Sequence, residues 1–145
     1  MSKFPVVIVD SDALIAQVNP KDIHHQKATQ ISKKLVDIKA RVIYPATTIA
    51  EATVHMQRVL NSTAAAYGTV KLMTDPAVQV AEVNQQTLVK ALEYFSPKTS
   101  KKNTLFDCIV ASVAEENEAD AIFSFDKFYK KNGFKLASEF LKLSS

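Results

Sequence analysis

The amino-acid sequence predicts an α/β fold in which helices cover both faces of a parallel β-sheet. Short, uninterrupted apolar runs such as residues 6–9 are typical of strands that are buried on both sides of a sheet. Between these runs lie longer segments in which apolar residues recur every three or four positions, as they do in amphipathic helices. Strands that alternate with helices in this way are typical of a parallel sheet.

The first half of the chain is predicted to form two strands and three helices. The strands are β-branched or apolar runs at residues 6–9 and 42–44, and Pro45 stops the second of them. Apolar residues at helical spacing predict helices at residues 22–38 and 48–60. A further apolar stretch at residues 13–18 is predicted to be a helix or a turn, which ends at Asn19 and Pro20.

The second half continues the same alternation. Helices are predicted at residues 64–73, 87–95 and 105–116, and prolines follow the first two. Strands are predicted at residues 78–83, 121–125 and 134–136, the last after an Asn-Gly turn. A polar, lysine-rich loop occupies residues 96–103. The whole of residues 1–145 is therefore expected to be one domain.

The composition excludes several classes of protein. Cys108 is the only cysteine, so no disulfide can form within the chain, and no run approaches the roughly 20 apolar residues that span a bilayer. We therefore expect a cytoplasmic protein that does not enter a membrane. The chain has only two glycines, which excludes a glycine-rich phosphate loop or dinucleotide fingerprint. The net charge of +3 permits a nucleic-acid partner without requiring one.

Four acidic residues are predicted to meet at one edge of the sheet. Asp10 and Asp126 directly follow predicted strands, so both lie at the carboxyl edge. Glu51 and Asp107 are expected in the first turns of two helices, which begin at that same edge. Ligands of open α/β sheets bind at this edge.

The two helical acids have a second explanation. Each stands three residues after a threonine, Thr48 or Thr104, which is the spacing of an N-terminal capping box. Capping alone could account for Glu51 and Asp107, but it cannot account for acids that follow strands.

Four clustered carboxylates call for a cation. Two unit charges about 4 Å apart repel each other by roughly 4 kcal/mol at an effective dielectric constant near 20. No histidine or cysteine is expected near all four acids, and an all-oxygen site suits Mg²⁺ or Mn²⁺ better than Zn²⁺. Such ions are typical of phosphodiester chemistry, where they activate water and stabilise the leaving oxygen.

These residues resemble the PIN-domain family, and most of all its VapC-type toxin ribonucleases. The resemblance runs from residue 6 to about residue 136 and rests on four motifs in order: VDSDALIA at residues 9–16, TIAE at 48–51, FDCIVASVA at 106–114 and ADAIFSFDKF at 119–128. It implies a three-layer fold with about five parallel strands, a Mg²⁺ or Mn²⁺ ion, and cleavage of RNA. It also implies a small antitoxin protein as a candidate partner, and we expect a homodimer.

The resemblance implies roles for individual residues. The catalytic, metal-binding acids would be Asp10, Glu51, Asp107 and Asp126. Ser124 matches a hydroxyl that often precedes the fourth acid by two residues. Asp12 stands where family members often have Ser, Thr or Asn, so it is a fifth ligand, a hydrogen-bond acceptor that supports the ligands, or a residue without a role.

Two groups of lysines are predicted to flank the acidic edge. The residues expected to bind the RNA backbone are Lys98, Lys101, Lys102, Lys127 and Lys130. The alternative is that these lysines are only a solvated surface. The sequence also leaves open whether Phe128 and Tyr129 belong to the core or stack on RNA bases.

Three other functions remain as alternatives. One is a PIN-type nuclease that processes RNA rather than a toxin. Another is a haloacid-dehalogenase-like phosphotransferase, in which Asp10 and Asp12 would act as nucleophile and acid, although no paired late acids follow the last strand. The third is a PIN-like module that binds RNA without cleaving it.

Overall fold

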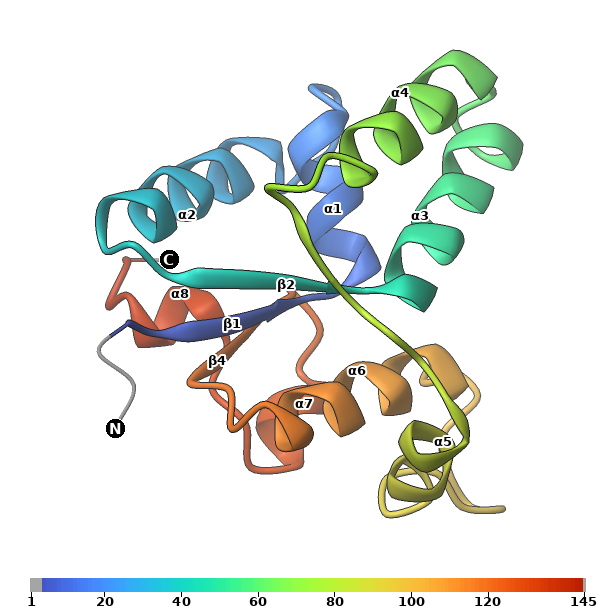
Figure 1. Ribbon diagram of the computed structural model, residues 1–145. Helices are drawn as coiled ribbons and strands as arrows, with labels where there is room; N and C mark the ends of the chain where they lie inside the picture. The colour runs from blue at the N-terminus through green and yellow to red at the C-terminus, as the bar shows by residue number, and fades with distance from the viewer. Residues whose placement is uncertain (1–3, 145) are drawn as a thin grey trace.

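A parallel sheet lies at the centre of the protein, and a computed structural model describes residues 4–144 of it (Figure 1). In this range the sheet has four strands in the order β3-β2-β1-β4, and every neighbouring pair is parallel. The strands are β1 (Val6–Val9), β2 (Arg41–Pro45), β3 (Gln79–Ala81) and β4 (Ala121–Phe123). The predicted α/β fold with a parallel sheet is confirmed.

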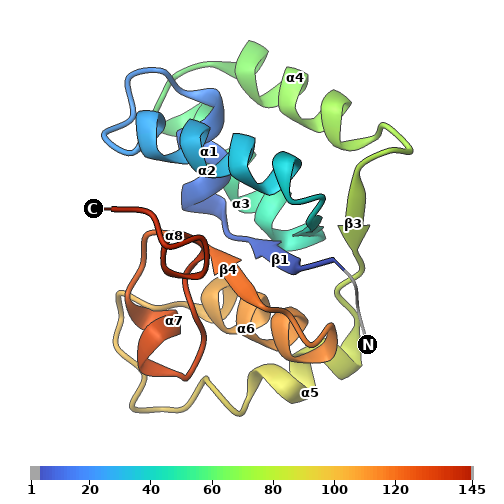
Figure 2. The same cartoon turned by 90° about the vertical axis from the view of Figure 1, so that its left-hand side faces the viewer.

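Helices cover both faces of the sheet. One face is covered by α1 (Ser11–Val18), α2 (His25–Asp37), α3 (Ala46–Arg58) and α4 (Thr63–Met73). The other is covered by α5 (Gln85–Ala91), α6 (Leu105–Glu116) and α7 (Phe128–Lys131). The short helix α8 (Ala137–Phe140) contacts β4, and Figure 2 shows it between the two layers of helices. No helix among residues 4–144 is long and apolar enough to cross a membrane.

The central strand β1 explains why both faces need a cover. All four of its side chains are buried, and they alternate between two cores. Val7 and Val9 pack with α1, α2 and α3, whereas Val6 and Ile8 pack with α6 and Tyr129. A strand that has strands on both sides and helices on both faces is buried everywhere, so its sequence is a continuous apolar run.

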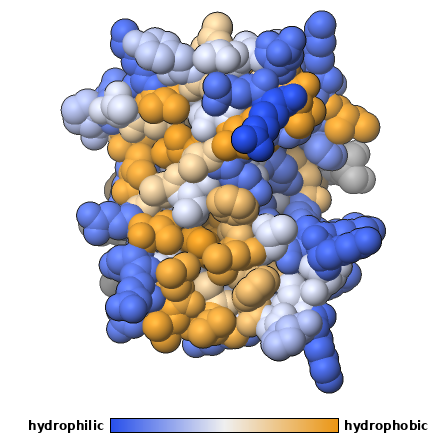
Figure 3. Space-filling view, turned by 90° about the vertical axis from the view of Figure 1, so that its right-hand side faces the viewer, coloured by the Kyte–Doolittle hydropathy of each residue, from blue (hydrophilic) through white to orange (hydrophobic). Residues whose placement is uncertain are grey.

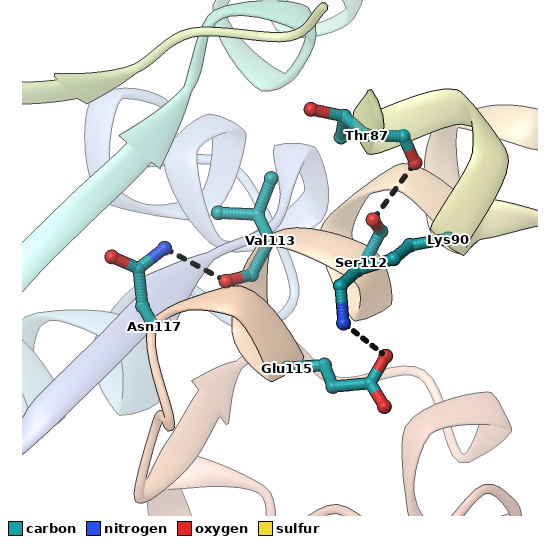
Figure 4. A network of polar contacts seen from close by, with 6 residues as sticks. All are labelled: Thr87, Lys90, Ser112, Val113, Glu115 and Asn117. Carbon is teal, nitrogen blue, oxygen red and sulfur yellow. Dashed lines mark hydrogen bonds and ion pairs between the residues drawn. The ribbon is translucent and has the colours of Figure 1, made fainter. Parts of the chain in front are cut away.

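The helices α5 and α6 are joined by polar contacts as well as by packing (Figure 4). The Ser112 hydroxyl donates to the backbone oxygen of Thr87 across 2.8 Å, and both side chains are buried. Lys90 and Glu115 form an exposed ion pair at 3.7 Å, which adds little to stability because water screens it. The buried contact holds α5 against α6.

The sheet has fewer strands than expected. The strand predicted at residues 134–136 is reduced to an isolated bridge between Ile122 and Leu136. The strand predicted at residues 121–125 ends at Phe123, because the backbone N–H of Phe125 donates to the Asp12 carboxylate instead of a neighbouring strand. The carboxyl end of β4 is therefore shaped by a side chain of the site.

The prediction that Thr48 caps a helix was wrong. The helix α3 begins directly after β2, with Pro45 in the N-cap position. Thr48 lies inside the helix, is buried, and donates its hydroxyl to the backbone oxygen of Val9 across 2.9 Å. It therefore ties α3 to the end of β1, and no capping box joins it to Glu51.

Other differences lie at the ends of helices. The helix α1 begins at Ser11, where the Asp10 carboxylate accepts from the first N–H. The helix α2 begins at His25 rather than residue 22, because the Asp22 side chain forms a local turn with the N–H of His24. The short helices α7 and α8 were not predicted, since four residues are too few to show a helical period.

Candidate active site

Five acidic residues lie in segments at the carboxyl edge of the sheet, where β1 leads into α1 and β2 leads into α3 in Figure 1. Asp10 follows β1, Asp12 lies in the first turn of α1, and Asp107 lies in the first turn of α6. Asp126 follows β4, and Glu51 lies in the second turn of α3 rather than the first. Neighbouring carboxylates of this group raise the pKa of Asp10, Asp12, Glu51 and Asp107. The acids that the sequence predicted to converge do lie together.

Asp10 is the most buried acid of the site, with only 3% of its surface exposed. Its Oδ1 accepts from the backbone N–H of Ser11 at 2.7 Å. Its Oδ2 accepts from two hydroxyls, Tyr129 at 2.8 Å and Ser124 at 3.1 Å. Burial holds the pKa of Asp10 well above its usual range, and the nearby Asp12 and Asp107 carboxylates raise it further. The hydrogen bonds from Tyr129 and Ser11 oppose that rise.

Asp12 is anchored through one oxygen only. Its Oδ2 accepts from the backbone N–H of Phe125 at 2.8 Å and from the Ser124 hydroxyl at 3.1 Å. Its Oδ1 is buried and has no hydrogen-bond partner among the described residues. Burial raises the pKa of Asp12 to about 6, against hydrogen bonds that lower it, and Asp126 adds to the rise.

Ser124 joins Asp10 and Asp12. A hydroxyl has one hydrogen to donate, yet Ser124 Oγ lies 3.1 Å from Oδ2 of both acids. It also accepts from the backbone N–H of Asp126 at 3.0 Å. The hydroxyl hydrogen can be shared by both carboxylates in a three-centre hydrogen bond, or one carboxyl can carry a proton and donate it to Ser124. The pKa values of Asp10 and Asp12, both raised by burial, favour the second arrangement.

Asp107 both caps a helix and belongs to the site. Its Oδ2 accepts from the backbone N–H of Thr104 at 3.1 Å, so the cap predicted from the threonine spacing is formed on this side. The same oxygen accepts from the Asn103 amide at 3.4 Å, and Oδ1 lies 3.5 Å from the Tyr129 hydroxyl. Burial raises the pKa of Asp107, and Asp126 contributes to the rise. The capping contact predicted for Asp107 is therefore confirmed, and the same side chain lies among the other acids.

Asp126 is connected to Asp107 by Asn103. The Asn103 amide donates to Asp126 Oδ2 at 3.1 Å as well as to Asp107 Oδ2. Asp126 Oδ1 accepts from the backbone N–H of Phe128 and so fixes the start of α7. An amide NH₂ group has two hydrogens, so Asn103 can serve both acids at once.

Glu51 stands somewhat apart from the hydrogen-bonded acids. Its side chain is half-buried, and burial raises its pKa. A hydrogen bond with Ser11 opposes this rise, whereas the Asp107 and Asp12 carboxylates add to it. Glu51 therefore faces the same acids, although the contact expected with Thr48 is absent.

Neutral donors stand between the aspartates in a continuous series. In order, the series is Asp12, Ser124, Asp10, Tyr129, Asp107, Asn103 and Asp126. Of the three donors, only Ser124 was predicted. The sequence left Tyr129 undecided between a core and a base-stacking role, and it showed Asn103 only as the end of a loop. No spacing in the sequence marks a tyrosine or an asparagine as a bridge between distant acids.

The donor set suits a hard divalent cation. Among residues 4–144, no group of three or more His, Cys, Asp or Glu side chains is placed so that it could hold a metal ion. The chemistry of the oxygens nevertheless fits Mg²⁺ or Mn²⁺. Asp10, Asp12 and Asp107 each have one oxygen that accepts two hydrogen bonds, and a second oxygen, Oδ1, with unused acceptor capacity.

The predicted RNA-binding lysines are exposed and flank the acids. Lys98, Lys101 and Lys102 lie in the loop that ends at Asn103, within the segment that leads into α6. Lys127 directly follows Asp126 and is exposed. Lys130 is exposed as well, but it forms an ion pair with Glu139 at 3.3 Å.

The fold and site define an α/β protein with a partly buried carboxylate cluster at the carboxyl edge of its sheet. Comparison with known families identifies it further, because the model of the PIN domain matches residues 7–135. The chain belongs to the PIN-domain family. No curated protein matches its sequence.

Two solved structures show the same fold. VapC20 of Mycobacterium tuberculosis, a Sarcin-Ricin loop cleaving toxin, superposes with a TM-score of 0.77 at 18% sequence identity, covering 88% of this chain and 95% of that chain. The structure of FitAcB from Neisseria gonorrhoeae superposes with a TM-score of 0.61 at 12% identity, covering 95% of this chain and 94% of that chain. At such identities the likeness concerns the fold.

Proposed function

We propose that this protein is a divalent-metal-dependent endoribonuclease that hydrolyses the phosphodiester bonds of RNA. The observation that carries the proposal is the cluster of Asp10, Glu51, Asp107 and Asp126 at the carboxyl edge of a PIN fold. A carboxylate that is buried without a partner is destabilised by its charge, which raises its pKa. A bound cation compensates that charge, and oxygens with spare acceptor capacity can bind it.

The residues of the site would have two roles, binding the cation and positioning the carboxylates that bind it. Asp10, Glu51, Asp107 and Asp126 would hold the cation, Mg²⁺ or Mn²⁺. A cation there supplies an activated water and stabilises the charge that develops on the leaving oxygen. Ser124 and Asn103 keep the carboxylates in place through the hydrogen bonds described above.

The lysines would hold the RNA backbone against the charge of the acids. Phosphates approaching an acidic cluster are repelled unless cations flank their path. Lys98, Lys101, Lys102, Lys127 and Lys130 are all exposed on segments next to Asp107 and Asp126. They would therefore position the chain of phosphates without reading its bases.

The test of this function is RNA cleavage with and without a chelator. We expect the purified protein to cleave RNA in Mn²⁺ or Mg²⁺ and to stop in excess EDTA, because the carboxylates alone cannot activate water. Asp107→Asn, which removes charge but little volume, should lose cleavage and keep its circular dichroism spectrum. Cleavage that continues undiminished in EDTA would contradict the proposal.

We further propose a VapC-like toxin that acts with a small antitoxin protein. The support is the likeness in fold to VapC20 and the nearly complete mutual coverage of the two chains. Expression of the wild-type chain in bacteria should arrest growth, whereas expression of Asp107→Asn should not. Equal growth with both forms, at equal protein levels, would argue for a role in RNA processing instead.

We also propose a homodimer. An exposed apolar surface extends over α5 and the start of α6, and Figure 3 shows apolar residues gathered on this side of the molecule. Its members are Val80, Leu88, Leu92, Phe95, Leu105 and Phe106, each between 37 and 65% exposed. Contiguous apolar surface of this kind usually marks an interface.

A further inference from the structure

Tyr129 lies at the centre of the acidic site and is completely buried. Its hydroxyl is 2.8 Å from Asp10 Oδ2 and 3.5 Å from Asp107 Oδ1. Asp10 lies at the end of β1, whereas Asp107 lies in the first turn of α6. One side chain therefore touches acids from two elements that are nearly 100 positions apart in the sequence.

The position of this hydroxyl is fixed by the surrounding structure. The Tyr129 ring packs in the core beneath the sheet and makes an edge contact with Phe128, with ring centroids 5.3 Å apart. The backbone oxygen of Tyr129 accepts from the N–H groups of Asn132 and Phe134, which close the turn after α7. A rigid ring that is held on all sides gives its hydroxyl little freedom to move.

A hydroxyl in this place acts on the orientation of the carboxylates. Asp10 Oδ2 already accepts from both Ser124 and Tyr129, so it is turned towards the interior, and Oδ1 keeps spare acceptor capacity. Asp107 is held from the opposite side by Thr104 and Asn103. Residues that orient metal-binding side chains in this way usually change metal affinity by 10- to 100-fold when they are replaced.

We propose that Tyr129 is a positioning residue, whose hydroxyl holds Asp10 and Asp107 in the arrangement in which they bind a divalent cation together. It touches neither RNA nor the cation. The inference rests on the proposed function, since it assumes that these acids bind a metal ion. It adds a residue that neither the family match nor the acidic motifs identify.

The test compares Tyr129→Phe with wild type by calorimetric titration with Mn²⁺. The substitution removes one oxygen and keeps the ring that fills the core. We expect Mn²⁺ to bind about 10-fold more weakly, because the two carboxylates lose their common donor. Tyr44→Phe is the matched control, since Tyr44 is a largely buried tyrosine of β2 whose hydroxyl contacts Gln17, away from the acids. It should bind Mn²⁺ like the wild type.

Kinetics provide a second measurement. With RNA as substrate, Tyr129→Phe should lower kcat and leave KM unchanged, because the Tyr129 side chain is completely buried and cannot contact the RNA. Raising Mn²⁺ about 10-fold should restore most of the lost rate. Circular dichroism at both Mn²⁺ concentrations checks that the variant is folded throughout, because a bound cation would also stabilise a partly unfolded variant. Equal Mn²⁺ affinity in a folded Tyr129→Phe variant and the wild type would overturn this inference and leave the proposed function standing.

Two further outcomes are decisive. A wild-type protein that binds no Mn²⁺ would overturn the proposed metal site together with the inference. If Tyr129→Phe fails to fold, the wild-type protein can be labelled at its tyrosine rings and titrated with Mn²⁺ in NMR experiments. The paramagnetic ion should then broaden the Tyr129 signals before those of Tyr67, which is exposed on α4. Broadening of Tyr67 first, with Tyr129 unaffected, would reject the inference.

Discussion

Asp12 shows how strongly a single substitution can change the electrostatics of a buried site. It stands where a neutral Ser, Thr or Asn is expected from the PIN resemblance, yet it lies half-buried beside Asp10. One of its oxygens holds Ser124 and the turn after β4, and the other has no partner among the described residues. Asp12 therefore anchors the end of β4, a structural role that the sequence did not suggest.

The raised pKa of Asp12 makes stability depend on pH. Because this carboxyl has a pKa of about 6 in the folded protein and 3.8 as its ordinary value, the folded state binds more protons between these pH values. The metal-free protein should therefore lose stability as pH rises from about 4 to about 6.

Replacing Asp12 by Asn should remove part of this dependence. We expect the melting temperature of Asp12→Asn in EDTA to exceed that of wild type at pH 7.5 and to approach it at pH 5. Scanning calorimetry at both pH values measures the difference. Asp37→Asn, at the exposed end of α2, is the control and should change neither value. A lower melting temperature for Asp12→Asn at pH 7.5 would show that the hydrogen bonds of the carboxylate outweigh its burial.

At the scale of elements, the sequence predicted the helices and strands whose apolar spacing and capping residues agree with their packing in the fold. The bounds of α6 were predicted correctly, because its apolar residues, its Thr104 cap and its burial all indicate the same helix. The start of α3 was predicted wrongly. The Thr48 hydroxyl suggested a helix cap, but it donates to the backbone oxygen of Val9 at the end of β1 instead. That contact spans 39 positions, and no local pattern can reveal it.

The same limit applies to the site. Acids that end strands were found because strand ends are visible in the sequence and the topology of a parallel sheet brings them together. Tyr129 and Asn103 were missed because their roles depend on which side chains meet across the fold. The short helix α7, which carries Tyr129, has no sequence period of its own and is held by the tertiary structure.

The loop before α6 should bind RNA through its lysines. Because Asn103 ties its end to Asp107 and Asp126, Lys101 and Lys102 are kept close to the acids. Phosphate contacts release counterions, so the logarithm of affinity should fall linearly with the logarithm of salt, with a slope of about −0.7 per phosphate on single strands.

Replacing Lys101 and Lys102 together by Ala should flatten this slope by about one unit, and similarly for different RNA sequences. Fluorescence anisotropy at several salt concentrations measures it. The matched control is Lys33→Ala with Lys34→Ala on α2, where both lysines are exposed and belong to neither predicted group. An unchanged slope in the loop variant would mean that its lysines are only solvated.

For the whole molecule, the apolar surface over α5 and α6 predicts self-association. Light scattering after size-exclusion chromatography should give twice the mass of one chain. Leu92→Glu places a charge on this surface at a residue that is 65% exposed, and it should shift the mass to that of a monomer. Val36→Glu, on α2 and 76% exposed, should not shift it. A monomeric wild-type protein at high concentration would reject the dimer.

The long separation between the partners in the site determines when a newly made chain can complete its cluster of acids. Asp10 precedes its partner Ser124 by 114 residues and Tyr129 by 119. At ribosomal rates of 5–20 residues per second, roughly ten seconds pass between the synthesis of Asp10 and that of Tyr129. Until then β1 lacks its neighbour β4, and the first acid lacks the two hydroxyls that orient it. In the ribonuclease proposed above, this delay would keep the nascent chain from cleaving the messenger and the ribosome that are still producing it.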